Sequence, residues 1–556
     1  MMTSSFSRQA FLSLEVNTQQ ADIPVQPTED LRLRVLQWLL QENEVGCLKD
    51  TTCLWDVFPD RPSSCMVHIV VSDPEVSKMV ENLDGPYFHQ RKKLRQDLSR
   101  RIGSLRAAYS PSETISSAAK IGELHEGINA RIHLTHPGGA PAAIFNPALA
   151  ALQRDLDRLD QVEVTCHDVQ HATEYVGLAL KNYDSEADRK SATEESINAA
   201  VDRVGDWHTK LDWADSIRPD CCWWHEGFAF TVLTLKNIVG LAGNPLLEAI
   251  LVYGKIISQS KYKQFREFCN FPIILVGVAD IHIDISIAVW VGEIQFTTLL
   301  TFNVTAGFLA SDNAIRLARV FKALSSCQKA LALYYSEVGQ KKTRPLSSLF
   351  PSPTPVDHSV ELPNLTYKQF LTRLGQPASG IVGLEDRTTA MYIAALDGIE
   401  NGVIVKFTPR YNEKAHRILA SAGLAPKLHF CARIISGLYM VVMERVEGKS
   451  LWQLQADAEP IPIIILDHVR RAVSLLHEQN IVFGDLREPN ILYNASESCV
   501  DIVDFDWSGV HNVDRYPATL NPTHKWPEDI VPYGLMLKAH DLWQLERLEG
   551  LCKPDA

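Results

Sequence analysis

Two acidic signals lie in the segment NIVFGDLREPNILYNASESCVDIVDFDWSG, residues Asn480–Gly509. The first is Asp485, which is followed five positions later by Asn490, and the second is Asp504 within the run Val503–Asp506. Transfer of a phosphoryl group from ATP needs one carboxylate that accepts the proton of the attacking hydroxyl. It also needs an Asn and a second Asp that hold Mg²⁺ on the nucleotide phosphates. The spacing therefore predicts a phosphotransfer site in this segment.

The residues around these signals have the periodicity of short, connected elements. An amphipathic helix is expected at Ile464–Gln479, and a short buried strand at Ile481–Phe483. Two further strands, Ile491–Tyr493 and Val500–Val503, are expected to pair across a polar turn. This pairing would place Asp504 beside the amide and the base, on strand ends whose backbone order preorganises the charges.

An apolar strand upstream ends in a lysine. Strands are expected at Met391–Leu396 and Gly402–Phe407, and Lys406 comes at the end of the second one. A lysine there can contact the α- and β-phosphates of ATP, as in the V-A-I-K strand of kinases. A lysine taken alone is more often an exposed surface residue. Glu413 then begins a helix that Gly423 ends.

Together these motifs resemble the protein-kinase-like superfamily. The form G-D-L-x-x-x-N with D-F-D is closest to the aminoglycoside phosphotransferase and choline kinase branch, and to fungal kinase-domain proteins with F-G-D-L-R-x-P-N-I-L and D-F-D-W-x-G. The resemblance covers about residues 365–548 and implies a two-lobed fold. It implies that Asp485 is the catalytic base, that Asn490 and Asp504 bind Mg²⁺, and that Lys406 contacts the phosphates.

The resemblance also implies two further contacts with the nucleotide. In aminoglycoside phosphotransferases the helix Glu pairs with the strand Lys, which here implies a pair between Glu413 and Lys406, seven residues apart. The segment from Met443 to Val446 is the candidate hinge, and the backbone of Glu444 and Val446 would meet adenine. A strand end before a turn is the alternative for the hinge residues.

The sequence departs from the family pattern at several positions. Gly375, Gly380 and Gly383 lie where a phosphate-covering loop is expected, but G-x-G-x-x-G is absent, and ordinary turns explain these glycines equally well. Phe483 replaces the usual His, and Asp506 replaces the usual Gly. A pseudokinase that binds nucleotide without turnover is therefore an open alternative.

Two features follow the second acidic signal. Trp526–Glu528 resembles the A-P-E end of an activation segment. Asp541 lies on an expected helix near the end of the sequence, where it either braces the catalytic loop or is a surface acid.

The middle of the chain has the pattern of an α/β core. Long helices are expected at Pro147–Leu159 and Ala192–Leu211, followed by strands and by a closing helix at Asp312–Val338. Between Phe271 and Phe302, acidic residues interrupt an apolar stretch rich in β-branched side chains, which predicts paired strands rather than a membrane helix.

This middle region resembles the PD-(D/E)xK nuclease fold, as found ahead of the kinase in Crinkler-related fungal proteins. Asp220 and Lys236-Asn237 match that motif, but Thr234 stands at the Glu position and Glu248 at the Gln position. A hydroxyl cannot replace a carboxylate as an Mg²⁺ ligand without loss of charge. A degenerate nuclease-like domain is therefore expected, and a nuclease-like effector that acts on nucleic acid is a second alternative function.

Two histidines in the middle region have a spacing that metal sites use. His167 and His171 lie at i and i+4, next to Cys166 and Asp168. A metal site needs three or four ligands, so a surface cluster of polar residues is the expected interpretation.

The N-terminal region carries weaker signals. A helix is expected at Leu31–Glu42, and the Leu54–Pro74 stretch, V-F-P-D-x-P followed by a strand, resembles the end of the Crinkler header. A strand in an ordinary accessory domain is the alternative. The charged stretch Asn82–Ala108, which contains the basic run Arg91–Lys93 and the pair Arg100-Arg101, predicts a solvated helix, with nuclear targeting as the rarer alternative.

Composition limits the class of protein. The chain has 556 residues, 46% of them hydrophobic, and a net charge of −13, which predicts several globular domains and gives no support for nonspecific nucleic-acid binding. The 11 cysteines are scattered, and the N-terminus has no secretory pattern. An intracellular protein in cytoplasm or nucleus, without a membrane segment, is expected.

The sequence thus predicts an α+β multidomain protein. The expected parts are an N-terminal region (1–102), a degenerate nuclease-like α/β domain (103–340), a Pro/Ser-rich linker (341–364) and a two-lobed protein-kinase-like domain (365–556). The expected function is an ATP- and Mg²⁺-dependent phosphotransferase that acts on a hydroxyl, most often Ser or Thr of a partner protein. A small-molecule acceptor remains a further option.

Overall fold

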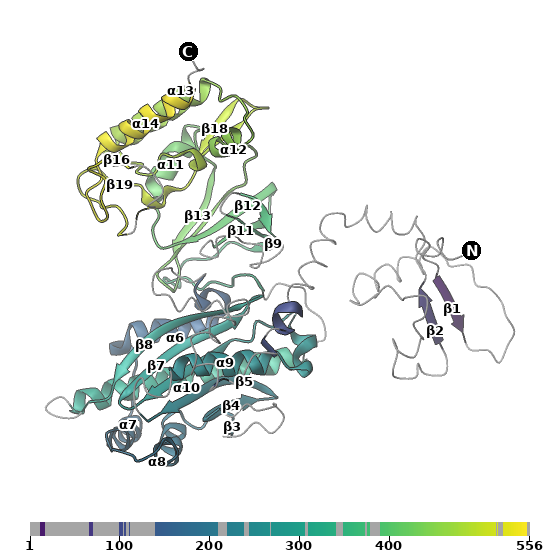
Figure 1. Cartoon of the computed structure of the whole chain (residues 1–556), viewed down its shortest axis with the longest axis vertical. Helices are drawn as coiled ribbons and strands as arrows, with labels where there is room; N and C mark the ends of the chain where they lie inside the picture. Colours follow the sequence, from purple (N-terminus) through teal and green to yellow (C-terminus); the bar gives the residue numbers. More distant parts are fainter. Residues whose placement is uncertain are drawn as a thin grey trace. The chain divides into compact units, whose positions relative to one another are not determined.

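In the computed structural model, the chain forms two compact units, Met1–Gln96 and Asp97–Ala556 (Figure 1). The structure describes residues 12–16, 66–70, 99–103, 105–106, 111, 140–208, 219–237, 244–266, 268–305, 310–340, 349–372, 375–378, 390–518, 520 and 526–552.

In the first unit, two short strands form an antiparallel pair. β1 (Leu12–Val16) pairs with β2 (Met66–Val70), with Leu12 opposite Val70. The strand expected after the Pro-rich turn is therefore confirmed at β2. The helix expected at 31–42, the basic run at 91–93 and the rest of the Crinkler-like stretch lie outside the described residues.

A six-stranded mixed sheet forms the middle part of the second unit. Its strands are β3 (Asp206–His208), β4 (Cys221–His225), β5 (Phe228–Lys236), β6 (Ile273–Ala279), β7 (His282–Trp290) and β8 (Ile294–Asn303). They pair in chain order, and only β5 and β6 run parallel. The apolar stretch between Phe271 and Phe302 is thus three strands, as expected.

Helices accompany this sheet, and some contact its strands whereas others pack on neighbouring helices. The helices are η3 (Ala142–Phe145), α6 (Pro147–Asp157), η4 (Leu159–Gln161), α7 (Cys166–Ala179), α8 (Glu186–Ala200), α9 (Pro245–Ile257), η5 (Ser260–Phe265) and α10 (Ala310–Gln340). Helix α9 connects the parallel strands β5 and β6, as a parallel crossover requires, and packs on both. Gly277 on β6 allows this approach, because a Cβ there would lie 2.7 Å from the backbone nitrogen of Leu246.

One expected helix of the middle part is shorter than its sequence pattern. The helix predicted at Ala192–Leu211 ends at Ala200, and β3 follows. Asp202, Arg203 and Gly205 adopt positive φ values, which an α-helix cannot accommodate. The helical periodicity of the sequence does not reveal this reversal.

The C-terminal part begins with a six-stranded antiparallel sheet in the order β10-β9-β11-β12-β14-β13. Its strands are β9 (Leu365–Leu371), β10 (Pro377–Ala378), β11 (Met391–Leu396), β12 (Ile399–Thr408), β13 (Leu428–Arg433) and β14 (Tyr439–Glu444). Helix α11 (Glu413–Ser421) lies between β12 and β13 in the chain, and the side chain of Asn412 caps its N-terminus. The strands and the helix expected here are confirmed.

A helical part with small sheets follows. Its elements are β15 (Lys449–Ser450), α12 (Leu451–Ala456), α13 (Ile464–Glu478), β16 (Ile481–Val482), η8 (Glu488–Asn490), β17 (Ile491–Asn494), β18 (Cys499–Ile502), η9 (Phe505–Trp507), β19 (Gly509–Val510) and α14 (Lys538–Cys552). The apolar face of α13 enters the core that α11 and α14 share. The predicted pairing of the two strands after Asn490 is confirmed as β17 with β18.

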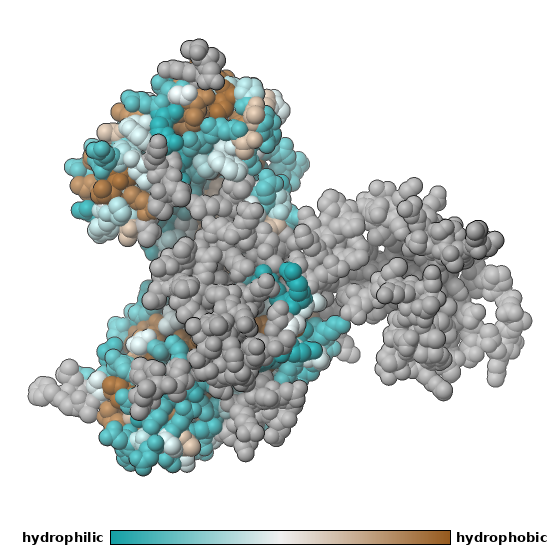
Figure 2. Space-filling model, in the orientation of Figure 1, coloured by the Kyte–Doolittle hydropathy of each residue, from teal (hydrophilic) through white to brown (hydrophobic). Residues whose placement is uncertain are grey.

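On the face that Figure 2 shows, the coloured surface of the second unit is mostly hydrophilic, with separate hydrophobic patches on both the middle and the C-terminal part. None of the helices in the described ranges is long and apolar enough to cross a membrane. The eight cysteines that the structure describes are free thiols. Five lie in the middle part (Cys166, Cys221, Cys222, Cys269 and Cys327) and three in the C-terminal part (Cys431, Cys499 and Cys552).

Candidate functional site

Lys406 lies between two carboxylates. It belongs to β12, which pairs with β11 on one side and β14 on the other. Its Nζ atom is 2.7 Å from Oδ1 of Asp504 and 2.8 Å from Oδ1 of Asp506. The lysine side chain is 12% exposed, so the pairing compensates for the removal of its charge from water.

The turn after β18 presents both of these carboxylates. Asp504 adopts a left-handed conformation with φ 71° and ψ 71°, which Asp tolerates better than most side chains. The preceding residue, Val503, donates its N–H to the carbonyl of Asn490 at 3.0 Å. This bond ties the turn to the segment that carries the first acidic signal.

The first signal forms a hydrogen-bonded group of its own. Nδ2 of Asn490 donates to the carbonyl oxygen and to Oδ2 of Asp485, both at 2.9 Å. Arg487 engages both carboxylate oxygens of Asp485, with Nη2 2.6 Å from Oδ2 and Nε bonded to Oδ1. The Arg487 guanidinium also lies 5.8 Å and 5.7 Å from the ring centres of Trp507 and Trp526.

A buried carboxylate on α14 holds the backbone before Asp485. Asp541 is fully buried and accepts hydrogen bonds from the N–H groups of Phe483 and Gly484, at 2.8 Å and 2.9 Å. Its Oδ2 also lies 2.9 Å from Nε2 of His477. Of the two sequence-based alternatives for Asp541, the structure therefore favours the brace of this loop over the surface acid.

Gly484 is needed at this point of the loop. Its φ is +81°, and a Cβ would lie 2.5 Å from the terminal methyl of Met536 and 3.0 Å from the carbonyl oxygen of Trp507. A side chain would therefore meet both strain and a clash.

Electrostatics distinguish the acidic groups. The buried position of Asp485 raises its pKa, although the charge of Arg487 opposes this. Burial and then the charge of Asp504 raise the pKa of Asp506. Burial also acts to raise the pKa of Asp504, but the charge of Lys406 together with hydrogen bonds from Lys406 and Asp506 keeps that pKa below its usual value. Burial alone would lower the pKa of Lys406, but the two carboxylates raise it. Asp504 is thus the most readily ionised of the three acids.

An aromatic stack supports the second acidic signal. Phe505 packs parallel to the ring of His416 on α11, with centres 4.6 Å apart, and edge-on to Phe483 at 5.5 Å. His416 donates from Nε2 to the carbonyl of Pro426 and accepts the Tyr411 hydroxyl at Nδ1, which fixes its neutral tautomer. Phe483, at the position of the usual His, thus takes part in the packing.

The structure does not bring together every residue that the sequence predicted. Glu413 pairs with Arg417 across one helical turn at 2.8 Å and is 43% exposed, and Lys406 pairs with the turn carboxylates instead. The expected pair between Glu413 and Lys406 is therefore corrected. Asp506, on the turn that follows β18, contacts the lysine at 2.8 Å in the place expected of Glu413.

The candidate hinge has the backbone arrangement of a strand end. Glu444 ends β14 and donates its N–H to the carbonyl of Lys427 at 2.9 Å, and Val446 is half-buried two residues later. Their contact with adenine stays a prediction. Gly375 lies at an exposed turn with φ +77°, and Gly380 and Gly383 lie outside the described residues.

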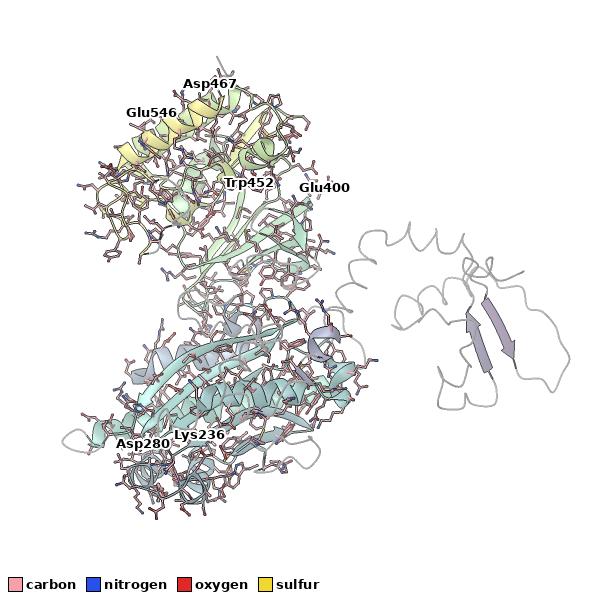
Figure 3. The ribbon with its side chains drawn as sticks, viewed as in Figure 1. Lys236, Asp280, Glu400, Trp452, Asp467 and Glu546 are labelled. Carbon is pink, nitrogen blue, oxygen red and sulfur yellow. The ribbon has the colours of Figure 1, made fainter. Side chains whose placement is uncertain are left out.

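The middle part contains a second lysine with two carboxylates. Lys236, labelled in Figure 3, ends β5 and lies 2.9 Å from Oε2 of Glu248 and 3.2 Å from Oε1 of Glu186. Asp220 accepts the N–H of Leu235 at 2.7 Å, and the buried Thr234 hydroxyl donates to the carbonyl of Pro245.

The remaining motif residues of the middle part have structural partners. Asn237 accepts a hydrogen bond from the buried Arg189 at 2.9 Å, and its amide donates to the carbonyl of Tyr183. Glu226 lies at the turn between β4 and β5 with its side chain 48% exposed, at the other end of β5 from Lys236. It therefore does not supply the missing carboxylate.

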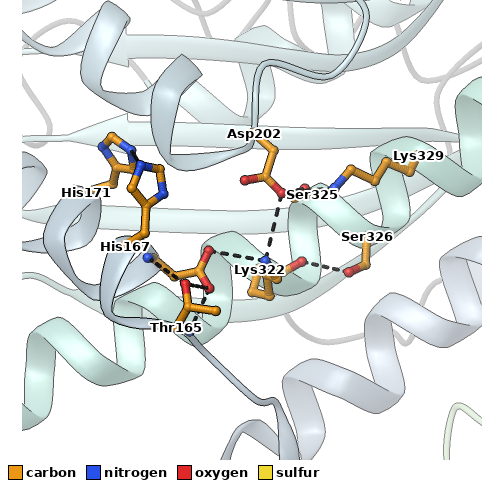
Figure 4. A network of polar contacts seen from close by, with 9 residues as sticks. Thr165, His167, His171, Asp202, Lys322, Ser325, Ser326 and Lys329 are labelled. Atoms are coloured by element: carbon orange, nitrogen blue, oxygen red, sulfur yellow. Dashed lines mark hydrogen bonds and ion pairs between the residues drawn. The ribbon is translucent and has the colours of Figure 1, made fainter.

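The histidine pair of α7 is shown in Figure 4. The Nε2 atoms of His167 and His171 lie 3.1 Å apart, and Asp168 is engaged by its own helix cap at Thr165 and by Lys322. Across the described ranges, the structure contains no group of three or more His, Cys, Asp or Glu placed to hold a metal ion. The surface interpretation of the histidine pair stays a prediction.

Sequence reasoning missed two residues of the C-terminal site. Arg487 was part of the quoted motif without a role, and Asp506 was noted only as a replacement for Gly. Charged residues two positions from a predicted base and a predicted metal ligand are a usable signal, because their side chains are confined to the same small volume.

Comparison with known proteins finds similarity to protein kinases. No family model matches the chain. The chain is 28% identical over 186 residues to the eye isozyme of protein kinase C from Drosophila melanogaster, over 31% of this chain and 26% of that protein. The chain thus spans about a quarter of that relative. Among solved structures, the PK-1 kinase of Cydia pomonella granulovirus aligns with a TM-score of 0.25 and 17% identity, over 29% of this chain and 63% of that chain.

The similarity to protein kinase C supports a kinase-like domain, and a phosphotransferase at the level of the family. The mixed α/β architecture is compatible with this class.

Proposed function

We propose that the C-terminal part is an ATP- and Mg²⁺-dependent phosphotransferase that transfers the γ-phosphoryl group to a hydroxyl, with Ser or Thr of a protein as the acceptor. The observation that carries the proposal is the convergence of Lys406, Asp485, Asn490 and Asp504. Lys406 contacts Asp504, and Asn490 contacts Asp485. The two pairs are joined through Val503, the residue before Asp504, whose N–H donates to the carbonyl of Asn490. Phosphoryl transfer depends mainly on such positioning and on charge.

The side chains present fit the nucleotide and the metal. The amide nitrogen of Asn490 donates to Asp485, so its Oδ1 atom remains as an oxygen donor for a cation. Asp504 is ionised, and its side chain is 36% exposed. Carboxylate and carbonyl oxygens are the ligands that Mg²⁺ prefers. Bound there, Mg²⁺ would neutralise charge on the phosphates, and Lys406 would add one positive charge.

Asp485 is the group that would accept the proton of the acceptor hydroxyl. Its carboxylate is held by Asn490 and Arg487, and the loop that carries it is anchored by Asp541 through two backbone N–H groups. A base fixed by three independent partners loses little freedom when the acceptor binds. Arg487 occupies both carboxylate oxygens, so one of them must be released before a hydroxyl can bind.

Two classes of hydroxyl acceptor are compatible with the site. A protein Ser or Thr follows from the similarity to a protein kinase, and a small-molecule hydroxyl follows from the form of the G-D-L-x-x-x-N motif. Among the described residues of the middle part, no group of three or more His, Cys, Asp or Glu is placed to hold a metal ion, so a nuclease activity is not proposed.

Comparison of the phosphoproteomes of cells that express the wild-type chain or Asp485→Asn tests the proposal. The substitution keeps the shape of the side chain and its contact with Asn490 but removes the base. Phosphosites that depend on the wild-type chain and are absent with Asp485→Asn are the expected result. Equal phosphosite occupancy in both cell lines, at equal protein levels, would contradict the function.

A further inference from the structure

The lysine of the proposed nucleotide site has an unexpected partner. Kinase-like sites are expected to pair this lysine with a carboxylate on the following helix, which here is Glu413. That carboxylate is exposed and pairs with Arg417 on its own helix. Both carboxylates at Lys406 come instead from one three-residue turn, Asp504 and Asp506.

Asp506 is held in place from two directions. Its Oδ1 atom lies 2.8 Å from Nζ of Lys406, and its Oδ2 atom accepts the hydroxyl of Thr408 at 2.7 Å. Lys406 and Thr408 are two positions apart on β12, so their side chains lie on the same face of the strand. One strand therefore presents both groups that fix Asp506.

Asp504 is the more open of the two carboxylates. Its side chain is 36% exposed and that of Asp506 is 21% exposed. A cation that binds Asp504 withdraws one of the two negative charges from Lys406. A lysine that is only 12% exposed still needs a compensating carboxylate, and Asp506 remains to provide it.

We propose that Asp506 is a positioning residue that holds Lys406 for the nucleotide phosphates, while Asp504 serves the metal. This inference rests on the proposed function and assigns Asp506 the role expected of Glu413. The lysine and the metal ligand then belong to one turn, so the position of helix α11 does not decide whether Lys406 is in place.

The test is calorimetric titration of ATP into the full chain, once in EDTA and once with excess Mg²⁺. Because the contact of Lys406 with phosphate needs no metal, Asp506→Asn is expected to weaken ATP binding by about tenfold in both solutions. Asp504→Asn is expected to weaken binding only with Mg²⁺. Asp506→Glu, which keeps the carboxylate, is expected to restore part of the affinity.

Two further variants separate this role from a general loss of charge. Glu413→Gln is expected to leave both affinities within about twofold of the wild-type values. Asp467→Asn on α13 is the matched control, because its carboxylate is 68% exposed and pairs with Arg470 on the same helix; Asp467 is labelled in Figure 3. Melting temperatures of all variants show which of them fold, and Asp506→Glu replaces Asp506→Asn if the latter does not.

The outcomes are distinguishable. Weakened binding with Glu413→Gln and unchanged binding with Asp506→Asn would overturn the inference and leave the proposed function intact. Loss of binding with Asp506→Asn only in Mg²⁺ would also overturn it, because Asp506 would then act on the metal. Failure of the wild-type chain to bind ATP in either solution would overturn the proposed function, and this inference with it.

Discussion

The two lysine clusters of the second unit have similar charges and different surroundings. Lys406 lies two residues before the end of β12 and Lys236 ends β5, each strand belongs to a six-stranded sheet, and each lysine lies within 3.2 Å of two carboxylates. Around Lys406, the turn that supplies the carboxylates is bonded to Asn490, which holds Asp485. Around Lys236, Thr234 stands at the Glu position of the nuclease-like motif, and its hydroxyl donates a hydrogen bond to the carbonyl of Pro245.

The difference shows that a lysine with two carboxylates does not define a site by itself. Such a group becomes chemically useful when a base and a further oxygen ligand are held beside it. In the middle part the charges satisfy one another, as in a structural ion-pair network. The predictions below test whether Lys406 belongs to a reactive site and Lys236 to a structural ion-pair network.

Removal of each lysine gives the largest contrast. Lys406→Met is expected to lower phosphate transfer from ATP by about 10²-fold or more, because a positive charge at the phosphates is lost. Lys236→Met is expected to leave the rate within about twofold of the wild-type value. Initial rates of transfer to protein in a heat-inactivated extract provide the measurement. Equal losses in both variants would break the contrast.

Removal of the Asp541 carboxylate on α14 is expected to have the next largest effect. Asp541→Ala leaves the N–H groups of Phe483 and Gly484 buried without their acceptor, so a loss of about 4 kcal/mol in unfolding free energy is expected. Chemical denaturation of the full chain measures it. A loss below about 1 kcal/mol would show that the loop does not depend on Asp541.

The middle cluster should behave as a buried ion pair. Lys236→Met leaves Glu248 buried without its main partner, and a loss of about 3 kcal/mol is expected. Adding Glu248→Leu should recover most of this loss, since the unpaired charge is then removed. A double variant as unstable as Lys236→Met alone would speak against the pairing.

The stack beneath Phe505 predicts a pH dependence. Burial lowers the pKa of His416 to about 4, whereas the unfolded chain binds a proton near its usual pKa of about 6.5. The unfolded state therefore binds more protons as the pH falls, and stability is lost between about pH 6.5 and pH 4. Between pH 7 and pH 5 this amounts to about 2 kcal/mol.

Denaturation of the wild-type chain and His416→Gln at both pH values checks this. The variant is less stable at pH 7, but its loss on acidification should be smaller by the amount attributed to His416. An identical pH dependence in the two proteins would show that folding does not shift the pKa of His416.

The sequence predicted the parts of the site that depend on local pairing. Asp485, Asn490 and Asp504 lie within twenty residues, and the expected pairing of β17 with β18 is enough to bring them together. Lys406 is 98 positions from Asp504, and only the resemblance to kinases linked the two. The fold of the middle sheet was predicted in outline for the same reason, since its strands pair in chain order.

The remaining features depend on conformation that the sequence does not reveal. The left-handed turn at Asp504 decides that Asp506, rather than Glu413, reaches Lys406. The reversal after Ala200 is likewise set by consecutive positive φ values rather than by hydrophobic periodicity. Whether Asp541 was a brace or a surface acid could be decided only when α14 was placed against the loop.

The most direct test of the central claim is transfer of radiolabelled γ-phosphate from ATP by the purified full chain with Mg²⁺. The comparison is between the wild-type chain, Asp485→Asn and the matched control Asp467→Asn. Loss of a general base predicts that Asp485→Asn transfers phosphate about 10²- to 10⁴-fold more slowly, and that the control equals the wild type. Equal incorporation by the wild-type chain and Asp485→Asn would contradict the assignment of a phosphotransferase site to this part of the molecule.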